Sequence, residues 1–158
     1  MGDAPFMTRE ETSKYSDKLA DGRIRQFSFV MDARSVITSP TAADTMERGW
    51  HEIRGIAWSG RGKINGVEIS IDGGKSWEAA RLQGPVLPKA HTRFTLPFFW
   101  TGTTTEIQSR AIDETGYVQP TLKQLKQVRA SDGIPYHFNP VTGWHIASDG
   151  KVLFTETG

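Results

Sequence analysis

The fold is decided by residues 64–77, whose sequence is Ile-Asn-Gly-Val-Glu-Ile-Ser-Ile-Asp-Gly-Gly-Lys-Ser-Trp. Val67, Ile69 and Ile71 alternate with polar residues, which is the two-residue period of a strand with one buried face and one solvated face. Two glycines follow, and they can take the positive φ angles of a tight turn before the tryptophan opens a second apolar run. The stretch therefore predicts a β-hairpin.

Similar alternation marks further strands on both sides of this hairpin. Pro97 interrupts one of them and indicates an edge position or a bulge, because proline cannot donate to a central ladder. Apolar residues three apart after Pro120 also allow one short amphipathic helix at Leu122, Leu125 and Val128. We expect strands at residues 24–34, 36–39, 50–58, 94–100 and 106–113, and a closing hairpin over 144–154. About seven or eight short strands with few helices predict an all-β sandwich.

Composition limits the classes of function. The chain has 158 residues, the size of one domain, and it has 0 Cys, so thiolate ligands and cysteine nucleophiles are excluded. Its 19 basic and 18 acidic residues give a net charge of +1, which favours neither nucleic acid nor an anionic membrane as a partner. No apolar stretch approaches the length of a membrane helix, and no targeting signal is visible. The first residues are polar, and Thr8 to Glu11 could cap a helical turn.

Two motifs carry a family resemblance. Residues 55–82, including Gly-Ile-Ala-Trp-Ser-Gly-Arg-Gly and the hairpin, resemble the C-terminal dimerisation domain of sulfite-oxidase-type molybdenum enzymes. Residues 109–120, Ser-Arg-Ala-Ile-Asp-Glu-Thr-Gly-Tyr-Val-Gln-Pro, resemble the second signature of the same family, and the two occur in the family's order. The likeness is greatest to the molybdenum subunit of bacterial sulfite (sulfane) dehydrogenases, and it covers nearly the whole chain.

The resemblance implies an organisation and a role. Residues 1–23 would be a linker arm from a preceding catalytic domain, and residues 24–158 an immunoglobulin-like dimerisation domain. The parent protein would be a periplasmic oxidoreductase of inorganic sulfur compounds that carries molybdopterin-bound molybdenum in the preceding domain. We therefore expect no cofactor in this chain and no catalysis by the chain alone, a homodimer as its assembly, and a cytochrome-type electron-acceptor subunit as a partner of the parent.

Candidate site residues are few. The four histidines, His51, His91, His137 and His145, lack the close spacing of a local metal site. The adjacent carboxylates of Asp113 and Glu114 lie at a strand end before a Thr-Gly turn, which favours a structural role. We therefore predict no catalytic, cofactor-binding or metal-binding residue. The resemblance gives Arg110 and Arg129 as the basic positions that could face an anionic substrate or an interface, because guanidinium groups suit sulfur oxyanions.

Two other interpretations stay open. Residues 70–77 also fit the Asp-box turn of sialidase-like propellers, although the motif occurs once and a propeller needs repeated blades. The five tryptophans exceed what a core of this size needs. A free-standing ligand-binding or carbohydrate-binding sandwich could use Trp50, Trp58, Trp77 or Trp100 as an exposed platform, although most tryptophans belong to cores.

Overall fold

The computed structural model describes residues 16–18, 21–22, 24–26, 30–129 and 138–156. The sequence predictions for Thr8 to Glu11 and for His137 lie outside this part of the chain. The described elements form three sheets and one helix. They are β1 (Ser16–Lys18), β2 (Ile24–Gln26), β3 (Arg34–Ser39), β4 (Gly49–Trp58), β5 (Ile64–Ser70), β6 (Glu78–Ala79), β7 (Arg81–Gln83), β8 (Thr92–Trp100), β9 (Thr105–Asp113), α2 (Leu122–Arg129), β10 (Thr142–Ile146) and β11 (Val152–Glu156).

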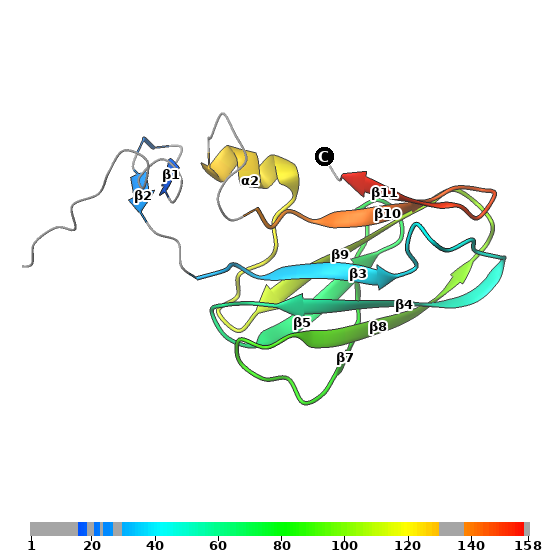
Figure 1. The fold of residues 1–158 in the computed structure, drawn as a ribbon, viewed down its shortest axis with the longest axis horizontal. Coiled ribbons are helices and arrows are strands. Elements are labelled where there is room, and N and C mark those ends of the chain that lie inside the picture. The colour runs from blue at the N-terminus through cyan, green and yellow to red at the C-terminus, as the bar shows by residue number, and fades with distance from the viewer. Residues whose placement is uncertain (1–15, 19–20, 23, 27–29, 130–137, 157–158) are drawn as a thin grey trace, which may run out of the picture.

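Two antiparallel sheets pack face to face and confirm the predicted all-β sandwich (Figure 1). One sheet has the strand order β3-β4-β8-β7, and the other has the order β11-β10-β9-β5-β6. The two sheets contain nine strands rather than seven or eight among the described residues, because the chain after the central hairpin forms two very short strands. Of these, β6 pairs with β5 in one sheet, and β7 pairs with β8 in the other.

The core lies between the inward faces of both sheets, as the alternation predicts. Phe94 and Leu96 on β8, Ile53 on β4 and Ile107 on β9 are all buried. Gly55 on β4 leaves room for the Phe94 ring, because a Cβ atom at Gly55 would lie 2.2 Å from the Phe94 Cζ. Each buried aliphatic or aromatic side chain of this kind contributes roughly 1.5–3 kcal/mol to folding.

The hairpin of residues 64–77 is confirmed, with one correction. Ile69 pairs with Glu78 across the turn, and Val67 and Ile69 are buried. Ile71, however, is 43% exposed, because β5 ends at Ser70 and the chain has already begun to turn. Local alternation gives no sign of where a strand stops. The sequence therefore predicted burial as far as Ile71, whereas the buried positions of this strand face end at Ile69.

The turn of this hairpin is held by its own polar groups. Gly73 and Gly74 have φ angles of 73° and 89°, a conformation that suits glycine. The Asp72 carboxylate accepts hydrogen bonds from the Ser76 hydroxyl and from the backbone N–H groups of Lys75 and Ser76. These bonds, led by that of the Ser76 hydroxyl, hold the pKa of Asp72 well below its usual range. The aspartate therefore has a structural role, as a tight turn requires.

The predicted strand over residues 24–34 is wrong. Residues 24–26 form β2, which pairs with β1 in a separate two-stranded sheet, and the sandwich strand β3 begins only at Arg34. Between them, Met31 is 49% exposed while the neighbouring Asp32 and Ala33 are both buried, so burial does not alternate here as it would along a strand. The reason is tertiary, since the Asp32 carboxylate accepts a charge-assisted hydrogen bond from the distant Arg61. Phe27 and Phe29, within the same predicted strand, lie outside the described residues.

Two smaller predictions are confirmed. Pro97 pairs with Glu52 on β4, while β7 reaches only Arg93 to Thr95 on the other side of β8, so Pro97 occupies a locally unpaired edge. The helix after Pro120 is α2, which buries Leu125. Within the described ranges, no helix has the length and apolar character needed to cross a bilayer.

One buried side chain joins the two sheets. The Gln119 Oε1 accepts hydrogen bonds from the Ser35 N–H at 2.8 Å and the Ser35 hydroxyl at 2.8 Å in one sheet, and from the Ala111 N–H at 3.1 Å in the other. Its Nε2 donates to the Pro140 carbonyl at 3.0 Å, just before β10. Ser35 also bonds to Ser109 on β9 at 2.9 Å. This arrangement satisfies buried backbone groups that would otherwise lack partners.

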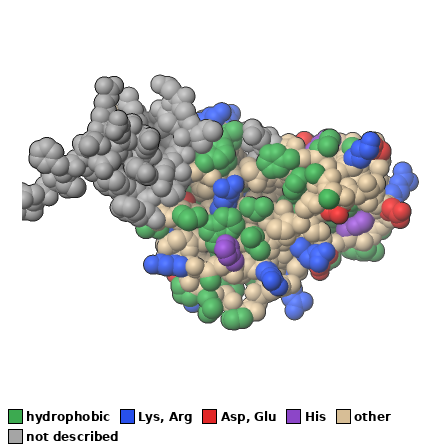
Figure 2. All heavy atoms as spheres, viewed as in Figure 1, with side chains coloured by type: hydrophobic (Ala, Val, Ile, Leu, Met, Phe, Trp, Pro, Cys, Tyr) green, Lys and Arg blue, Asp and Glu red, His purple; other side chains and the backbone are tan. Residues whose placement is uncertain are grey.

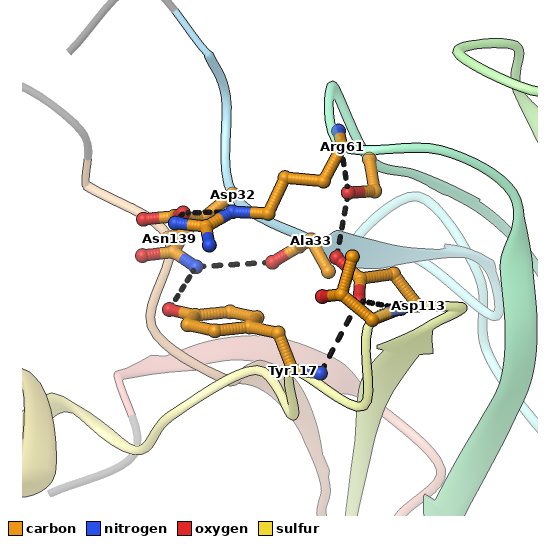
Figure 3. Close-up of polar contacts among 8 residues, drawn as sticks. Asp32, Ala33, Arg61, Asp113, Tyr117 and Asn139 are labelled. Carbon is orange, nitrogen blue, oxygen red and sulfur yellow. Dashed lines mark hydrogen bonds and ion pairs between the residues drawn. The ribbon is translucent and has the colours of Figure 1, made fainter.

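The end of β9 is closed by a second buried group. The Asp113 carboxylate accepts hydrogen bonds from the Ser59 hydroxyl at 2.8 Å and from the backbone N–H groups of Thr115 and Tyr117 (Figure 3). Burial by itself would raise the pKa of Asp113, but these bonds and that of the Thr115 hydroxyl outweigh it and lower the pKa. Asp113 therefore fixes a turn, as the sequence favoured.

Replacing Gln119 tests the link between the sheets. Gln119→Leu keeps the shape of the side chain but leaves the buried N–H groups of Ser35 and Ala111 without an acceptor. We expect a loss of about 2–4 kcal/mol in the free energy of unfolding, measured by urea denaturation. The control Gln127→Leu changes an exposed glutamine of α2 and should alter stability by less than about 0.5 kcal/mol. Equal effects of the two substitutions would contradict the role of Gln119.

Replacing Asp113 tests the turn through its pH dependence. Because the pKa of Asp113 is lower in the folded chain than in the unfolded chain, its ionised form stabilises the fold above about pH 4, and this contribution is lost as the pH falls through the folded pKa. Asp113→Asn should therefore cost about 1–3 kcal/mol at pH 7, and the difference from the unsubstituted chain should shrink below about pH 4. Denaturation midpoints across this pH range would check it, and a constant difference would count against it.

Candidate functional site

The outer face of the five-stranded sheet carries the first candidate residue, Arg110. Its Nε donates to the Glu68 Oε2 at 2.6 Å, and its guanidinium carbon lies 4.2 Å from the centre of the Trp77 ring. Glu68 and Arg110 are direct cross-strand partners on β5 and β9. The half-buried guanidinium is thus held by an ion pair and a cation–π contact.

This arginine lies in a broad groove over the sheet. The hairpin turn with Trp77 forms one wall, Gln108 and Arg110 line the groove between the walls, and α2 contributes Gln124 and Gln127 to the opposite wall. The groove therefore brings together two parts of the chain that the resemblance singled out, Arg110 and the helix that ends at Arg129. The side chain of Arg129 lies outside the described residues, so the structure places only its backbone.

A second cluster closes the end of the sandwich where β3 begins. Arg61 donates from Nε to the Asp32 Oδ1 at 3.0 Å, and its guanidinium carbon lies 5.2 Å from the centre of the Tyr117 ring (Figure 3). The buried Asn139 donates from Nδ2 to the Ala33 carbonyl at 3.0 Å and to the Tyr117 hydroxyl at 3.2 Å. The cluster tethers the segment entering β3 to three distant loops, which is a structural use of these charges.

The tryptophans do not form a shared platform. Trp100, offered as an exposed candidate, is only 3% exposed, and its indole N–H donates to the Thr103 carbonyl at 2.8 Å. Trp144 donates to the Ile37 carbonyl at 3.2 Å across the sandwich. Trp58 and Trp77 are half-buried, whereas Trp50 is 75% exposed. Since Trp50 stands alone among the tryptophans in its exposure, no sugar-binding row of rings is present among the described residues.

The described side chains do not suit a molybdenum cofactor. No group of three or more His, Cys, Asp or Glu side chains in this part of the chain could hold a metal ion. The sequence has no Cys to supply a thiolate, and the candidate cation Arg110 is already paired with Glu68. The described part of the chain therefore offers no set of ligands for the metal.

The side chains that hold the strands and loops around the candidate residues in place were not predicted from the sequence. Gln119 and Tyr117 belong to the quoted stretch of residues 109–120, so a signal existed, but nothing local shows that Gln119 reaches β3. The ion pair of Asp32 and Arg61 joins residues 29 positions apart, and Asn139 contacts Ala33 from 106 positions away. Separations of this size leave no periodic trace in a sequence.

The chain is similar to parts of known oxidoreductases in both sequence and fold. The solved structure of the sulfane dehydrogenase SoxCD from Paracoccus pantotrophus matches with a TM-score of 0.86 and 48% identity, covering 96% of this chain and 39% of that chain. Sulfite oxidase from Gallus gallus is 33% identical over 97 residues, which are 57% of this chain and 21% of that protein. A nitrate reductase [NADH] from Solanum lycopersicum is 31% identical over 105 residues, or 57% of this chain and 12% of that enzyme.

A family model decides the membership. The Mo-co oxidoreductase dimerisation domain matches residues 25–143, which is more than half of the chain. The chain spans about a fifth or less of the two curated relatives, so it corresponds to one part of each of them. On this match and on the shared fold, the chain belongs to the family of Mo-co oxidoreductase dimerisation domains.

Proposed function

We propose that this chain is the dimerisation domain of a molybdenum-dependent oxidoreductase of the sulfite oxidase family that oxidises inorganic sulfur compounds. The observation that carries the proposal is the 48% identity, at a TM-score of 0.86, to a chain of a sulfane dehydrogenase. The family model that matches residues 25–143 describes a dimerisation domain, and this match supports a role in assembly.

The proposal includes a division of labour. Residues 1–23 act as the arm from a preceding domain, and residues 24–158 form an immunoglobulin-like sandwich that joins two subunits. The preceding domain holds molybdopterin-bound molybdenum, which supplies the two-electron acceptor that no side chain provides. A periplasmic location and a cytochrome-type electron acceptor belong to the same proposal, and the likeness to the sulfane dehydrogenase supports them.

Arg110 and Arg129 keep their place as predictions. Arg110 lines the groove, and Arg129 directly follows Val128, the last residue of α2 that lines it, which supports a shared role. The Arg110 guanidinium already contacts the Glu68 carboxylate and the Trp77 ring. To bind an oxyanion, it would have to leave these partners or use the guanidinium nitrogens that do not face Glu68. An interface role requires no such change, and we favour it for Arg110.

Self-association of the chain is the direct test of the proposal. Light scattering during gel filtration should give twice 17.6 kDa over a wide range of concentrations, because the family's domain joins identical subunits. A mass of one chain at every concentration, including about 1 mM, would overturn dimerisation by this chain.

Metal analysis tests the division of labour. The purified chain, incubated with the molybdenum cofactor released from another enzyme, should retain no molybdenum after gel filtration. Its sequence lacks cysteine, and the described side chains form no ligating cluster. Stoichiometric molybdenum, together with sulfite-dependent reduction of an electron acceptor, would contradict the proposal.

A further inference from the structure

An exposed asparagine followed by glycine lies at the start of β5. The ladder between β5 and β9 skips Asn65, because Ile64 pairs with Asp113 and Gly66 pairs with the adjacent Ile112. A residue skipped in this way is the extra residue of a β-bulge, which is left unpaired where the ladder is locally disrupted. Asn65 is therefore exposed and stands outside the regular ladder.

The surroundings of the Asn65–Gly66 peptide bond leave it room to move. β6 pairs with β5 only at Glu68 and Ile69, so among the described strands β9 alone lies beside residues 64–66. The Asn65 side chain has no hydrogen-bond partner in the described part of the chain. A Cβ atom at Gly66 would have no heavy atom within 4 Å apart from its chain neighbours, so the glycine borders open space.

This pair of residues can react with itself. The Gly66 nitrogen gives up its proton to water or hydroxide and bonds to the Asn65 Cγ, and glycine has no side chain to hinder this approach. The bond between Cγ and Nδ2 then breaks, and ammonia leaves. Water opens the resulting cyclic imide at either of its carbonyl groups, which gives aspartate or isoaspartate. The reaction consumes one water and releases one ammonia, so it needs no oxidant, reductant or cofactor.

The second asparagine of the chain is protected from this reaction. Asn139 is only 4% exposed, and its Nδ2 donates to the Ala33 carbonyl at 3.0 Å and to the Tyr117 hydroxyl at 3.2 Å. The next residue is Pro140, whose nitrogen carries no hydrogen and cannot form the imide. The fold and the sequence therefore direct the reaction to Asn65.

The exposed charged and apolar side chains form no comparable site on the face that Figure 2 shows. Hydrophobic side chains lie there in separate patches with basic ones between them. On the outer face of the five-stranded sheet, Arg110 is paired with Glu68 at 2.6 Å, and Glu106 lies near His145 at 3.7 Å. Asn65 differs because its reactivity depends on the next residue and the local backbone rather than on a patch of neighbours.

We propose that Asn65 is a site of spontaneous deamidation in the folded chain, where the β-bulge exposes the asparagine and Gly66 supplies the attacking nitrogen. Aspartate at this position adds one negative charge to the surface. Isoaspartate also adds one carbon to the backbone between the two residues, so the pairs on either side of the bulge, at Asp113 and Ile112, can no longer both keep their register. The inference goes beyond the proposed function and does not depend on it.

Peptide mapping after storage tests the site. The full chain is kept folded in mildly alkaline buffer, and trypsin then releases residues 64–75 by cutting after Lys63 and Lys75. Mass spectrometry should show the mass gain of deamidation in this peptide, at a rate of the same order as in a synthetic peptide of the same sequence and rising with pH. Isomerisation of Asp72 leaves the mass unchanged, so the gain reports Asn65 alone. An unchanged Asn65 in the folded chain, after the synthetic peptide has reacted, would overturn the proposal.

A glycine substitution tests the role of Gly66. Gly66→Ala fits the open space and should remove most of the mass gain, because the added Cβ crowds the attacking nitrogen. The matched control is Gly84→Ala, since Gly84 also borders open space, and this variant should deamidate as fast as the unsubstituted chain. Thermal melting checks that both variants are folded. Equal mass gains in the two folded variants would contradict attack by the Gly66 nitrogen.

A comparison of products tests the effect on the ladder. Asn65→Asp carries the new charge without the extra backbone carbon, so it should melt close to the unsubstituted chain. The isoaspartate form, separated from the stored chain by ion exchange, should melt at a lower temperature than Asn65→Asp. Identical melting of the two forms would show that the register at Asp113 and Ile112 survives, and would overturn that part of the inference.

Discussion

The hydrogen bonds of the Gln119 side-chain amide are the interaction on which the end of the sandwich near the start of β3 depends. Two sheets that pack through apolar faces have many relative positions of similar energy, since the hydrophobic effect is non-directional. The hydrogen bonds that Gln119 accepts from Ser35 and Ala111 and donates to Pro140 select one position, because buried N–H and carbonyl groups without partners are costly. Both sheets and the segment just before β10 are thereby bonded to the same side chain.

Strand β9 shows how the interior is divided along its length. Its inward residues change from Ile107 through Ser109 and Ala111 to Asp113, and all four are buried. One half of the interior is therefore held by apolar packing against residues such as Phe94, and the other half by directional hydrogen bonds. The polar half lies where the chain enters β3 and where distant loops must meet, and fixed geometry is most useful there.

This division bears on assembly. The polar end fixes its charges within the molecule, as in the pair of Arg61 and Asp32, and so presents a preformed surface beside the incoming segment. The opposite end exposes Trp50 and Phe99, which are held in place by each other and by the ladder of β4 and β8. A rigid aromatic pair loses little conformational entropy on association, so such an end suits contact with another molecule. The two ends of the sandwich therefore differ, with paired charges at one end and an exposed aromatic pair at the other.

The sequence by itself determined the long strands from β4 onward, the central hairpin and the helix after Pro120, because alternation, turn residues and helical spacing act over a few residues. It also excluded a cysteine-bound metal. Tertiary structure alone decided that β3 begins at Arg34, that Ile71 is exposed and that Trp100 is buried, since each depends on residues distant in the chain. The same holds for the site: Arg110 was identified from its motif, but its pairing with Glu68 and Trp77 required strands β5 and β9 to lie side by side. Hydrogen bonds across large sequence separations follow from the packing of the sheets, which no local pattern records.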